Sequence, residues 1–297
     1  MKKTLAMMTA AMMVAGALAG CGSSSSTPVA TTAEATTAAA TEAATTEVAT
    51  TEAGDTAAAA EGTVKTPSGK FTVGFDQEFP PMGFVGDDGQ FTGFDLDLAK
   101  EVASRLGLEF VPQPINWDAK DMELDSGNID CIWNGFTMQG REDAYTWVGP
   151  YMANNQVFVV TADSDIASKA DLAGKAVEVQ KDSSGLAALQ GDAELSASFG
   201  SMTEVADYNT ALMDLESGAC DAVCMDSIVA GYQIKSSGKD MKILDDTLSA
   251  EEYGIGFKKG EDELAKAVYD TLMERTDDGT VAMISNDWFG SDVFTLK

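Results

Sequence analysis

Alternating strand and helix patterns between residues 70 and 290 are the feature that most limits what this chain can fold into. Residues 71–75 alternate apolar and small side chains as a strand does, and a helix that Asp95 can cap keeps its apolar residues on one face until Gly107. Further strands are expected at 108–111, 129–133, 157–160, 176–180, 219–225 and 241–244, and helices at 121–126, 208–216, 227–235, 262–274 and 281–288. Repeated strand–helix units predict an α/β fold with parallel sheets that helices cover on both faces.

An internal similarity indicates that there are two such sheets. Residues 124–132 (LDSGNIDCI) match residues 215–223 (LESGACDAV). Each stretch is expected to be the end of a helix, a glycine that stops it, and a buried strand. The alternative is that the same common sequence of helix end, glycine and strand occurs twice by chance. The length from residue 67 to residue 297 suits one large domain or two smaller ones.

The N-terminal segment predicts export. A basic start followed by a short uncharged run, too short to span a bilayer, indicates a secretory signal peptide over residues 1–20. The run Leu18-Ala19-Gly20-Cys21 resembles a bacterial lipobox, which implies that Cys21 carries a lipid anchor; a free thiol is the alternative. Residues 21–66 contain no aromatic residue, Leu, Ile or Met, and we expect them to form a disordered tether.

Composition excludes several kinds of function. The net charge of −29 leaves no basic stripe, so neither nucleic acid nor an anionic lipid surface is an expected partner. The chain has no histidine, phosphate-binding loop, zinc spacing or calcium loop, so no cofactor or metal is expected. The cysteines after Cys21 lie among apolar neighbours, which predicts buried free thiols at Cys131, Cys220 and Cys224.

Open α/β sheets bind ligands beyond the carboxyl ends of their strands, so the residues that follow the predicted strands define a candidate site. These residues are Asp76, Phe79, Trp117, Gly135, Thr137, Arg141, Gln180, Ser183, Ser184 and Asp226. A guanidinium can bind a carboxylate through two parallel hydrogen bonds, a carboxylate can pair with an ammonium, and aromatic faces can enclose what remains. The combination suits a zwitterionic amino acid.

Several co-linear motifs resemble the polar amino-acid-binding proteins of ABC importers, which are family 3 extracellular solute-binding proteins. The motifs are FDQEFPPM (75–82), GFDLDLA (93–99), NWD (116–118), SGNID (126–130), PY (150–151), DLAGK (171–175), YGIG (253–256) and WFG (288–290). The resemblance implies a type II periplasmic-binding-protein clamshell with a discontinuous first lobe. Lobe 1 would comprise residues 67–160 and 251–297 and lobe 2 residues 161–250, with hinge crossings near 159–163 and 249–253.

The same resemblance implies a function, partners and a location. The chain would be a transport protein without enzymatic activity, which passes an amino acid to an ABC permease and its ATPase. It would be a monomer outside the cytoplasm, at the cell surface or in the periplasm, attached to the bacterial membrane by its lipid anchor alone.

Roles for the ligand's charged groups follow from the resemblance. Arg141 would hold the α-carboxylate, assisted by Thr137 and the backbone of Gly135, and Asp226 would accept the α-ammonium. Arg141 could instead form a surface ion pair with its acidic neighbours, and Asp226 could be only the N-cap of the next helix. The spacing from Thr137 to Arg141 is one residue shorter than the commoner form of the family.

The ligand side chain has its own expected contacts. Phe79 and Trp117 would flank it, although either could be a core aromatic. In lobe 2, Ser183 and Ser184 stand where the family usually has Gly-Thr-Thr, and Asp182 takes the place of the glycine.

Carboxylate and amide side chains near the predicted site would determine which amino acid is bound. The carboxylates of Asp76 and Glu78 disfavour an acidic ligand, and the Gln180 amide can hydrogen-bond another amide. The ligand is therefore expected to be a polar uncharged amino acid such as glutamine or cystine, with basic amino acids next. Two rival functions use the same fold. One is a dehydratase in which Glu78 or Asp182 performs acid–base chemistry, and the other is an amino-acid sensor for a signalling partner.

Overall fold

The computed structural model describes residues 66 and 68–297. The predicted signal peptide, the predicted lipid-modified Cys21 and the tether up to residue 65 lie outside the described residues. Within the described part of the chain, no helix combines the length and the apolar character needed to cross a bilayer.

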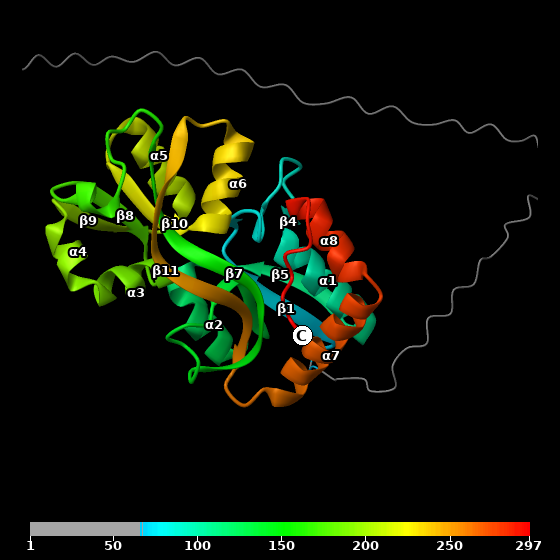
Figure 1. Ribbon diagram of the computed structural model, residues 1–297. Helices are drawn as coiled ribbons and strands as arrows, with labels where there is room; N and C mark the ends of the chain where they lie inside the picture. Colours follow the sequence, from blue (N-terminus) through cyan, green and yellow to red (C-terminus); the bar gives the residue numbers. More distant parts are fainter. Residues whose placement is uncertain (1–65, 67) are drawn as a thin grey trace, which may run out of the picture. The chain divides into compact units, whose positions relative to one another are not determined.

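Eight strands of the described chain form one mixed sheet. Their order in space is β5 (Glu109–Pro114), β1 (Lys70–Phe75), β6 (Cys131–Thr137), β11 (Met241–Lys258), β7 (Tyr145–Thr161), β10 (Ala222–Asp226), β8 (Ala176–Gln180) and β9 (Ser201–Val205). The first half, β5-β1-β6, and the second half, β10-β8-β9, each consist of parallel strands. The long strands β7 and β11 are antiparallel to each other and join the two halves (Figure 1).

Helices from both ends of the described chain cover the first half. Helix α1 (Phe94–Leu106) packs against the C-terminal helices α7 (Asp262–Asp277) and α8 (Thr280–Phe289) (Figure 1). The first half also contains a small sheet and two short helices: β2 (Glu78–Phe79), β3 (Gly83–Val85), β4 (Phe91–Thr92), η1 (Trp117–Ala119) and α2 (Lys120–Ser126). The second half carries η2 (Lys169–Leu172), α3 (Ser184–Gly191), α4 (Ala193–Ser198), α5 (Tyr208–Ser217) and α6 (Ser227–Ser237). The second half is therefore an insertion in the first.

The internal similarity predicted from the sequence is confirmed at the ends of two helices. Gly127 follows α2 with φ of 77°, and Gly218 follows α5 with φ of 79°, both in the left-handed conformation that glycine adopts without strain. Each glycine leads into a buried strand, β6 in the first half and β10 in the second. The two stretches are thus equivalent units of the two halves.

Two expectations from the sequence are corrected. The sequence predicted two sheets, but the structure has a single eight-stranded one. Strands β7 and β11 are 17 and 18 residues long, far longer than the apolar runs from which they were predicted, and they connect what would otherwise be two sheets. Asp95 does not cap α1, since the helix follows Gly93 and its first N–H groups donate to backbone carbonyls: Phe94 to Pro81 at 2.8 Å and Asp95 to Met82 at 3.0 Å.

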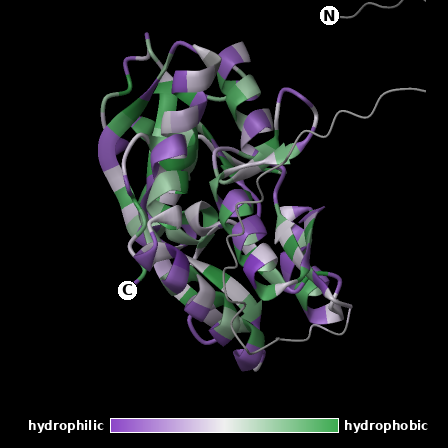
Figure 2. Cartoon of the chain, turned by 90° about the vertical axis from the view of Figure 1, so that its right-hand side faces the viewer, coloured by the Kyte–Doolittle hydropathy of each residue, from purple (hydrophilic) through white to green (hydrophobic). Residues whose placement is uncertain are grey.

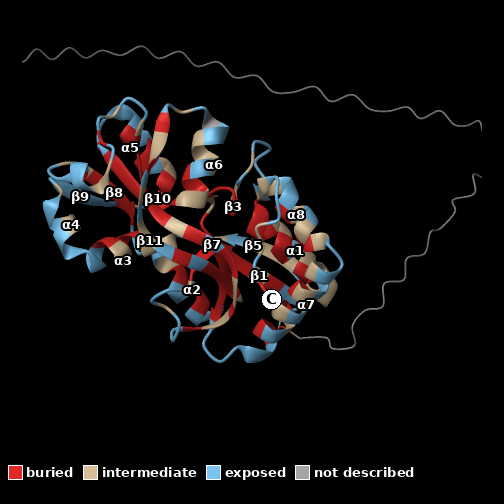
Figure 3. Cartoon of the chain, in the orientation of Figure 1, coloured by how far each residue is buried: buried red, intermediate tan, exposed pale blue. Residues whose placement is uncertain are grey.

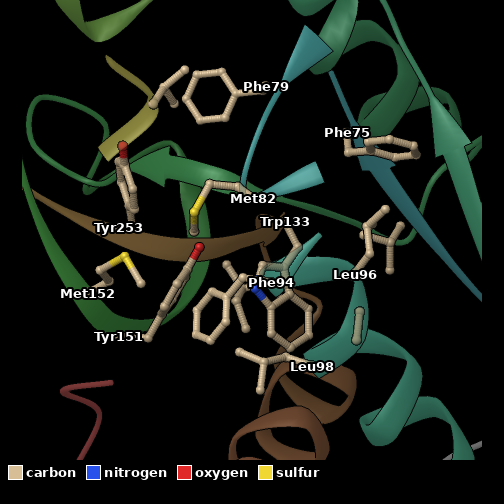
Figure 4. Packing of buried hydrophobic residues seen from close by; sticks show 14 of the residues in the cluster. Phe75, Phe79, Met82, Phe94, Leu96, Leu98, Trp133, Tyr151, Met152 and Tyr253 are labelled. Carbon is tan, nitrogen blue, oxygen red and sulfur yellow. The ribbon is translucent and has the colours of Figure 1, made fainter. Parts of the chain in front are cut away.

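Apolar side chains from the strands and from the inner faces of the helices form the core. Strands β1, β6, β7 and β10 are mostly buried, whereas the outer helical turns are exposed (Figure 3) and carry hydrophilic residues (Figure 2). In the first half, Trp133 and Tyr151 pack with Met82 and Phe94 beside the hydroxyl-bearing ring of Tyr253 (Figure 4). The three cysteines of the described chain are free and buried, as predicted.

Gly93 offers a test of how α1 is held. Its φ is 146°, and a Cβ there would lie 2.3 Å from the Met82 carbonyl oxygen, so Gly93→Ala should destabilise the protein by roughly 2–4 kcal/mol. Gly231→Ala is the matched control, because this glycine lies inside α6 with open space around its Cβ position and should gain about 0.5–1 kcal/mol from helix propensity. Urea unfolding measures both, and equal stabilities would contradict the steric account.

Candidate ligand-binding site

The predicted ligand-binding residues lie where the two halves of the sheet meet. Asp76 directly follows β1, and Gly135 and Thr137 are among the last residues of β6. Gln180 and Asp226 are the final residues of β8 and β10 in the second half. Each side chain is therefore at or near the carboxyl end of its strand, as the sequence pattern predicts.

A cavity of about 680 Å³ brings together four predicted residues from both halves. Thr137 and Arg141 line it from the first half, and Ser183 and Ser184 from the second. The Thr137 hydroxyl donates a hydrogen bond of 3.2 Å to the Ser184 hydroxyl across the boundary between the halves. A guanidinium and hydroxyl donors thus share one volume, and these are groups that can bind a carboxylate.

The guanidinium of Arg141 is held at this boundary. Its Nη1 donates to the Thr137 carbonyl at 3.1 Å, and its Nη2 donates to the Asp182 carbonyl of the other half at 3.3 Å. Its Cζ lies 5.0 Å from the centre of the Phe136 ring. These contacts favour a binding role over an ion pair with the acidic residues that follow in sequence. The short Thr137–Arg141 spacing therefore leaves the guanidinium at the cavity.

The loop between β8 and α3 presents its two serines differently. Asp182 has φ of 52°, a left-handed conformation that aspartate tolerates better than most residues other than glycine. The Ser183 hydroxyl accepts a hydrogen bond of 3.1 Å from the Leu186 N–H and so caps α3. The Ser184 hydroxyl faces the cavity and accepts a hydrogen bond of 3.1 Å from the Gln156 amide. Ser184 is therefore the serine whose side chain is directed to the site.

Asp226 is buried and accepts hydrogen bonds from three side chains. Asn154 and Tyr253 donate to Oδ1 at 2.7 Å each, and Tyr208 donates to Oδ2 at 2.8 Å. Its carboxylate makes no hydrogen bond to the helix that follows, so the interpretation of Asp226 as only an N-cap is wrong. Asp226 itself does not line the cavity that Thr137 and Arg141 share with Ser184.

A second buried carboxylate, Glu251, lies beside Asp226. The Asn154 amide donates to Asp226 at 2.7 Å and to Glu251 at 2.6 Å, and Gln156 donates to the same Glu251 oxygen at 2.9 Å. Burial, and then the charge of Glu251, raise the pKa of Asp226 to about 7. Sequence reasoning identified the segment 249–253 as a crossing but missed Glu251, because one acidic residue there carries no motif or periodic signal.

Asp76 and Gln180 contact each other across the same boundary. Gln180 Nε2 donates to the Asp76 carboxylate at 2.6 Å, which also accepts a hydrogen bond of 2.9 Å from the Glu78 N–H. Burial raises the pKa of Asp76 to about 6, and these hydrogen bonds oppose the rise. Asp76 and Trp117 line a second cavity, of about 810 Å³. Asp76 thus adjoins a space next to the Arg141 cavity, since Asp118 and Lys181 line both.

The two predicted aromatic residues differ in their surroundings. Phe79 is buried, with its ring centre 5.7 Å from that of Tyr208 in the other half, so it is also a core aromatic. Trp117 is half-buried, edge-on to Phe136 at 5.5 Å, and lines the second cavity. Trp117 is therefore the more accessible of the two.

Gly135 is held inside the first half. A Cβ at this position would lie 2.9 Å from the Phe79 ring and 3.1 Å from the Tyr253 ring, and φ is 56°. Its N–H donates at 2.7 Å to the buried carboxylate of Asp95, which also accepts a hydrogen bond of 2.8 Å from the Tyr151 hydroxyl. Burial raises the pKa of Asp95 to about 7. Because this N–H is engaged, the geometry does not support its expected help in holding a ligand carboxylate.

Metal binding finds no support in this region. Across residues 66 and 68–297, no group of three or more Cys, Asp or Glu side chains is placed to hold a metal ion.

The raised pKa of Asp226 has a consequence for stability. The folded protein binds the proton of the Asp226 carboxyl more tightly than the unfolded chain does, because the pKa is about 7 in the folded state and about 3.8 in the unfolded state. The folded protein therefore loses stability as the pH rises between these two values. The loss accumulates between about pH 4 and pH 8. Asp226→Asn should therefore gain stability relative to the wild type as the pH rises.

Urea unfolding at several pH values measures this effect. Asp171→Asn is the control: its carboxylate is exposed, and a hydrogen bond from Ser168 lowers its pKa, so it titrates below the window. If the free energy of unfolding changed with pH in the same way for the wild type and for Asp226→Asn, the prediction would be wrong, because Asp226 would then ionise in the folded protein without a loss of stability.

The chain is similar to known proteins over most of its length. The sequence pattern of bacterial extracellular solute-binding proteins, family 3, matches residues 71–291. An L-cystine-binding protein of Escherichia coli (strain K12) is 31% identical over 231 residues, which cover 76% of this chain and 84% of that protein. An L-cystine-binding protein of Bacillus subtilis (strain 168) is 31% identical over 229 residues, or 76% of this chain and 83% of that protein.

A solved structure extends the likeness to the fold. An ABC uptake transporter substrate-binding protein from Streptococcus pneumoniae with bound histidine superposes with a TM-score of 0.74 and 34% identity, covering 77% of this chain and 96% of the other. The predicted two-lobed α/β fold is confirmed, with the first half as lobe 1 and the second half as lobe 2. The chain belongs to the bacterial extracellular solute-binding proteins, family 3.

Proposed function

We propose that this protein captures an amino acid between its two lobes and delivers it to the permease and ATPase of an ABC importer. The observation that carries the proposal is the shared cavity, where Thr137 and Arg141 of lobe 1 face Ser184 of lobe 2 and Glu251 of β11. The names of the relatives that bind L-cystine, and the solved relative with bound histidine, support an amino acid as the ligand.

Arg141 binds the α-carboxylate in this proposal. Two of its five N–H donors are used by the carbonyls of Thr137 and Asp182, and the other donors remain for a ligand. The hydroxyls of Thr137 and Ser184, 3.2 Å apart, place a polar group from each lobe beside it. A carboxylate bound here contacts lobe 1 and lobe 2 together.

Asp226 and Glu251 together accept the α-ammonium. Glu251 lines the cavity and shares the Asn154 amide with the buried Asp226. The positive charge of the ligand offsets the repulsion between the two buried carboxylates, which favours the ionised form of Asp226.

The ligand side chain is directed toward Asp76, Gln180, Phe79 and Trp117. An amide and a carboxylate beside two aromatic rings favour a polar uncharged side chain such as that of glutamine or cystine, and basic amino acids come next. The carboxylate of Asp76 disfavours an acidic ligand.

Ligand exchange requires the lobes to move about two hinge crossings. We place lobe 1 at residues 67–160 and 251–297 and lobe 2 at residues 161–250, with crossings near 159–163 and 249–253. The pairing of Tyr253 with β6 supports the crossing in β11. In β7, residues 156–159 already pair with β10, which favours an earlier crossing near Asn155.

The proposal assigns binding without catalysis. The two side chains considered for acid–base chemistry have partners, since Asn209 donates to the Glu78 carboxylate and Lys120 contacts the Asp182 carboxylate. The family consists of solute-binding proteins. We further place the protein outside the cytoplasm as a monomer that the lipid on Cys21 anchors to the membrane.

Arg141→Ala should weaken amino-acid binding by at least about 2 kcal/mol, because the carboxylate of the ligand is left without its counter-ion. Titration calorimetry of the purified protein with L-cystine, L-glutamine and L-arginine measures the effect. Arg105→Ala, on the outer face of lobe 1 near Glu274, is the matched control and should bind normally. Binding by Arg141→Ala within twofold of the wild type would remove Arg141 from the site.

Cys21→Ser should release the protein from membranes and leave amino-acid affinity unchanged, because the anchor and the cavity belong to separate parts of the chain. Membrane fractionation and calorimetry on the same preparation measure both properties. A Cys21→Ser protein that still sediments with membranes would contradict lipid attachment at this residue.

A further inference from the structure

An ion pair that no sequence motif indicated joins the two lobes beside the site. Lys120, the first residue of α2, is only 2% exposed, and its ammonium contacts the carboxylate of Asp182 in the loop before α3. The same ammonium lies 3.5 Å from the Asp182 carbonyl oxygen and 5.4 Å from the centre of the Trp117 ring. Lys120 belongs to lobe 1 and Asp182 to lobe 2, so the pair exists only while the lobes are together.

Asp182 is the meeting point of two cationic groups from lobe 1. In addition to the contact with Lys120, its carbonyl accepts the hydrogen bond of 3.3 Å from Arg141. Two residues later, Ser184 contacts Thr137 of lobe 1. The position of Asp182 therefore determines how the loop that carries Ser184 meets Arg141 and Thr137.

The two partners of the ion pair differ in their access to water. The Lys120 side chain is 2% exposed, whereas that of Asp182 is 53% exposed. A buried ammonium without a counter-ion pays a large cost in lost hydration, but a half-exposed carboxylate stays hydrated. A neighbouring interlobe pair, Lys181 with Asp118, has 4.0 Å between its charged atoms and is about half exposed on both sides, so it contributes little.

We propose that the Lys120–Asp182 ion pair is a closing contact, which holds the two lobes together and positions the Ser183–Ser184 loop against Arg141. The inference rests on the proposed function as a two-lobed amino-acid receptor. When the lobes close, Lys120 is buried, and Asp182 is the residue that neutralises it. Lys120 and Asp182 are positioning residues, because they act on the ligand through the loop.

A double-mutant cycle tests the closing contact with Asp182→Asn, Lys120→Met and the combined variant. Asparagine also tolerates the left-handed conformation, so Asp182→Asn removes the charge and keeps the backbone of the loop. Lys258→Met is the matched control, because Lys258 pairs with Asp125 of α2 at 4.0 Å and both side chains are exposed.

The first readout is affinity, measured by calorimetry with L-cystine and L-arginine as probes. Asp182→Asn should weaken the binding of a probe about tenfold or more, because it leaves Lys120 buried and unpaired. Lys120→Met should cost less than about threefold, and the combined variant should match it, because removing the cation removes the penalty for losing its partner. The Lys258→Met control should stay within about twofold of the wild type.

The second readout is the distance between the lobes, which needs no ligand. Energy transfer between dyes on Lys100→Cys in α1 and Glu194→Cys in α4, both exposed positions, reports this distance in the Cys21→Ser chain. The cysteines of the described residues are buried and protected from the dyes. Asp182→Asn should lengthen the distance with and without probe, and adding Lys120→Met should shorten it again.

Either of two results would overturn the closing contact. One is an Asp182→Asn protein with the interlobe distance of the wild type, and the other is a larger loss of affinity for Lys120→Met than for Asp182→Asn. If neither probe binds the wild type, the proposed function fails for these amino acids. The distances measured without a probe still decide the closing contact in that case.

Discussion

The antiparallel pairing of β7 with β11 is the constraint on which the rest of the structure depends. Both strands run through both lobes, so the lobes can separate only by bending these strands. The pairing shifts register between Thr247 and Ser249 and between Tyr253 and Ile255, on either side of Glu251, and such irregularities let a strand bend. The middle of the pair also supplies Asn154 and Gln156 from β7 and Glu251 from β11, which bond to one another and to Asp226. The polar network of the site is therefore part of the hinge, and a ligand charge placed there acts directly on the strands that bend.

Buried carboxylates follow from this arrangement, and they are costly in a protein with a net charge of −29. Asp76, Asp95 and Asp226 all have a pKa raised by burial, and each is held by hydrogen-bond donors. Groups of this kind reduce stability at neutral pH, and they are typical of sites that use the charge. Asp95 differs from the other two, because both of its partners, Gly135 and Tyr151, lie within lobe 1. Its carboxylate holds the Gly135 backbone in place, whereas Asp76 and Asp226 lie where lobe 1 meets lobe 2.

Local sequence patterns were enough to predict the elements whose signal is periodic. The strand from Ala176 to Gln180 and the helix from Tyr208 agree with the structure, and α1 begins two residues earlier than the predicted cap at Asp95 implies. The short strands β2, β3 and β4 and the helices α3 and α4 were missed, because a few residues give no period to recognise. The candidate site was recoverable where it follows strand ends, as at Thr137 and Asp226. Glu251 and Lys120 were not recoverable, because each owes its place to contacts between segments far apart in sequence.

Asp182 and the loop between Thr137 and Arg141 are connected in the structure. The short loop leaves the Arg141 guanidinium within 3.3 Å of the Asp182 carbonyl, and the Asp182 carboxylate meets Lys120. A glycine at position 182 would allow the same left-handed backbone and the same contact with Arg141, but it would leave the Lys120 ammonium buried without a counter-ion. An apolar residue at position 120 would in turn leave the Asp182 carboxylate exposed to water and without a partner. The identity of residue 182 is therefore explained by residue 120 of the opposite lobe rather than by the turn in which it sits.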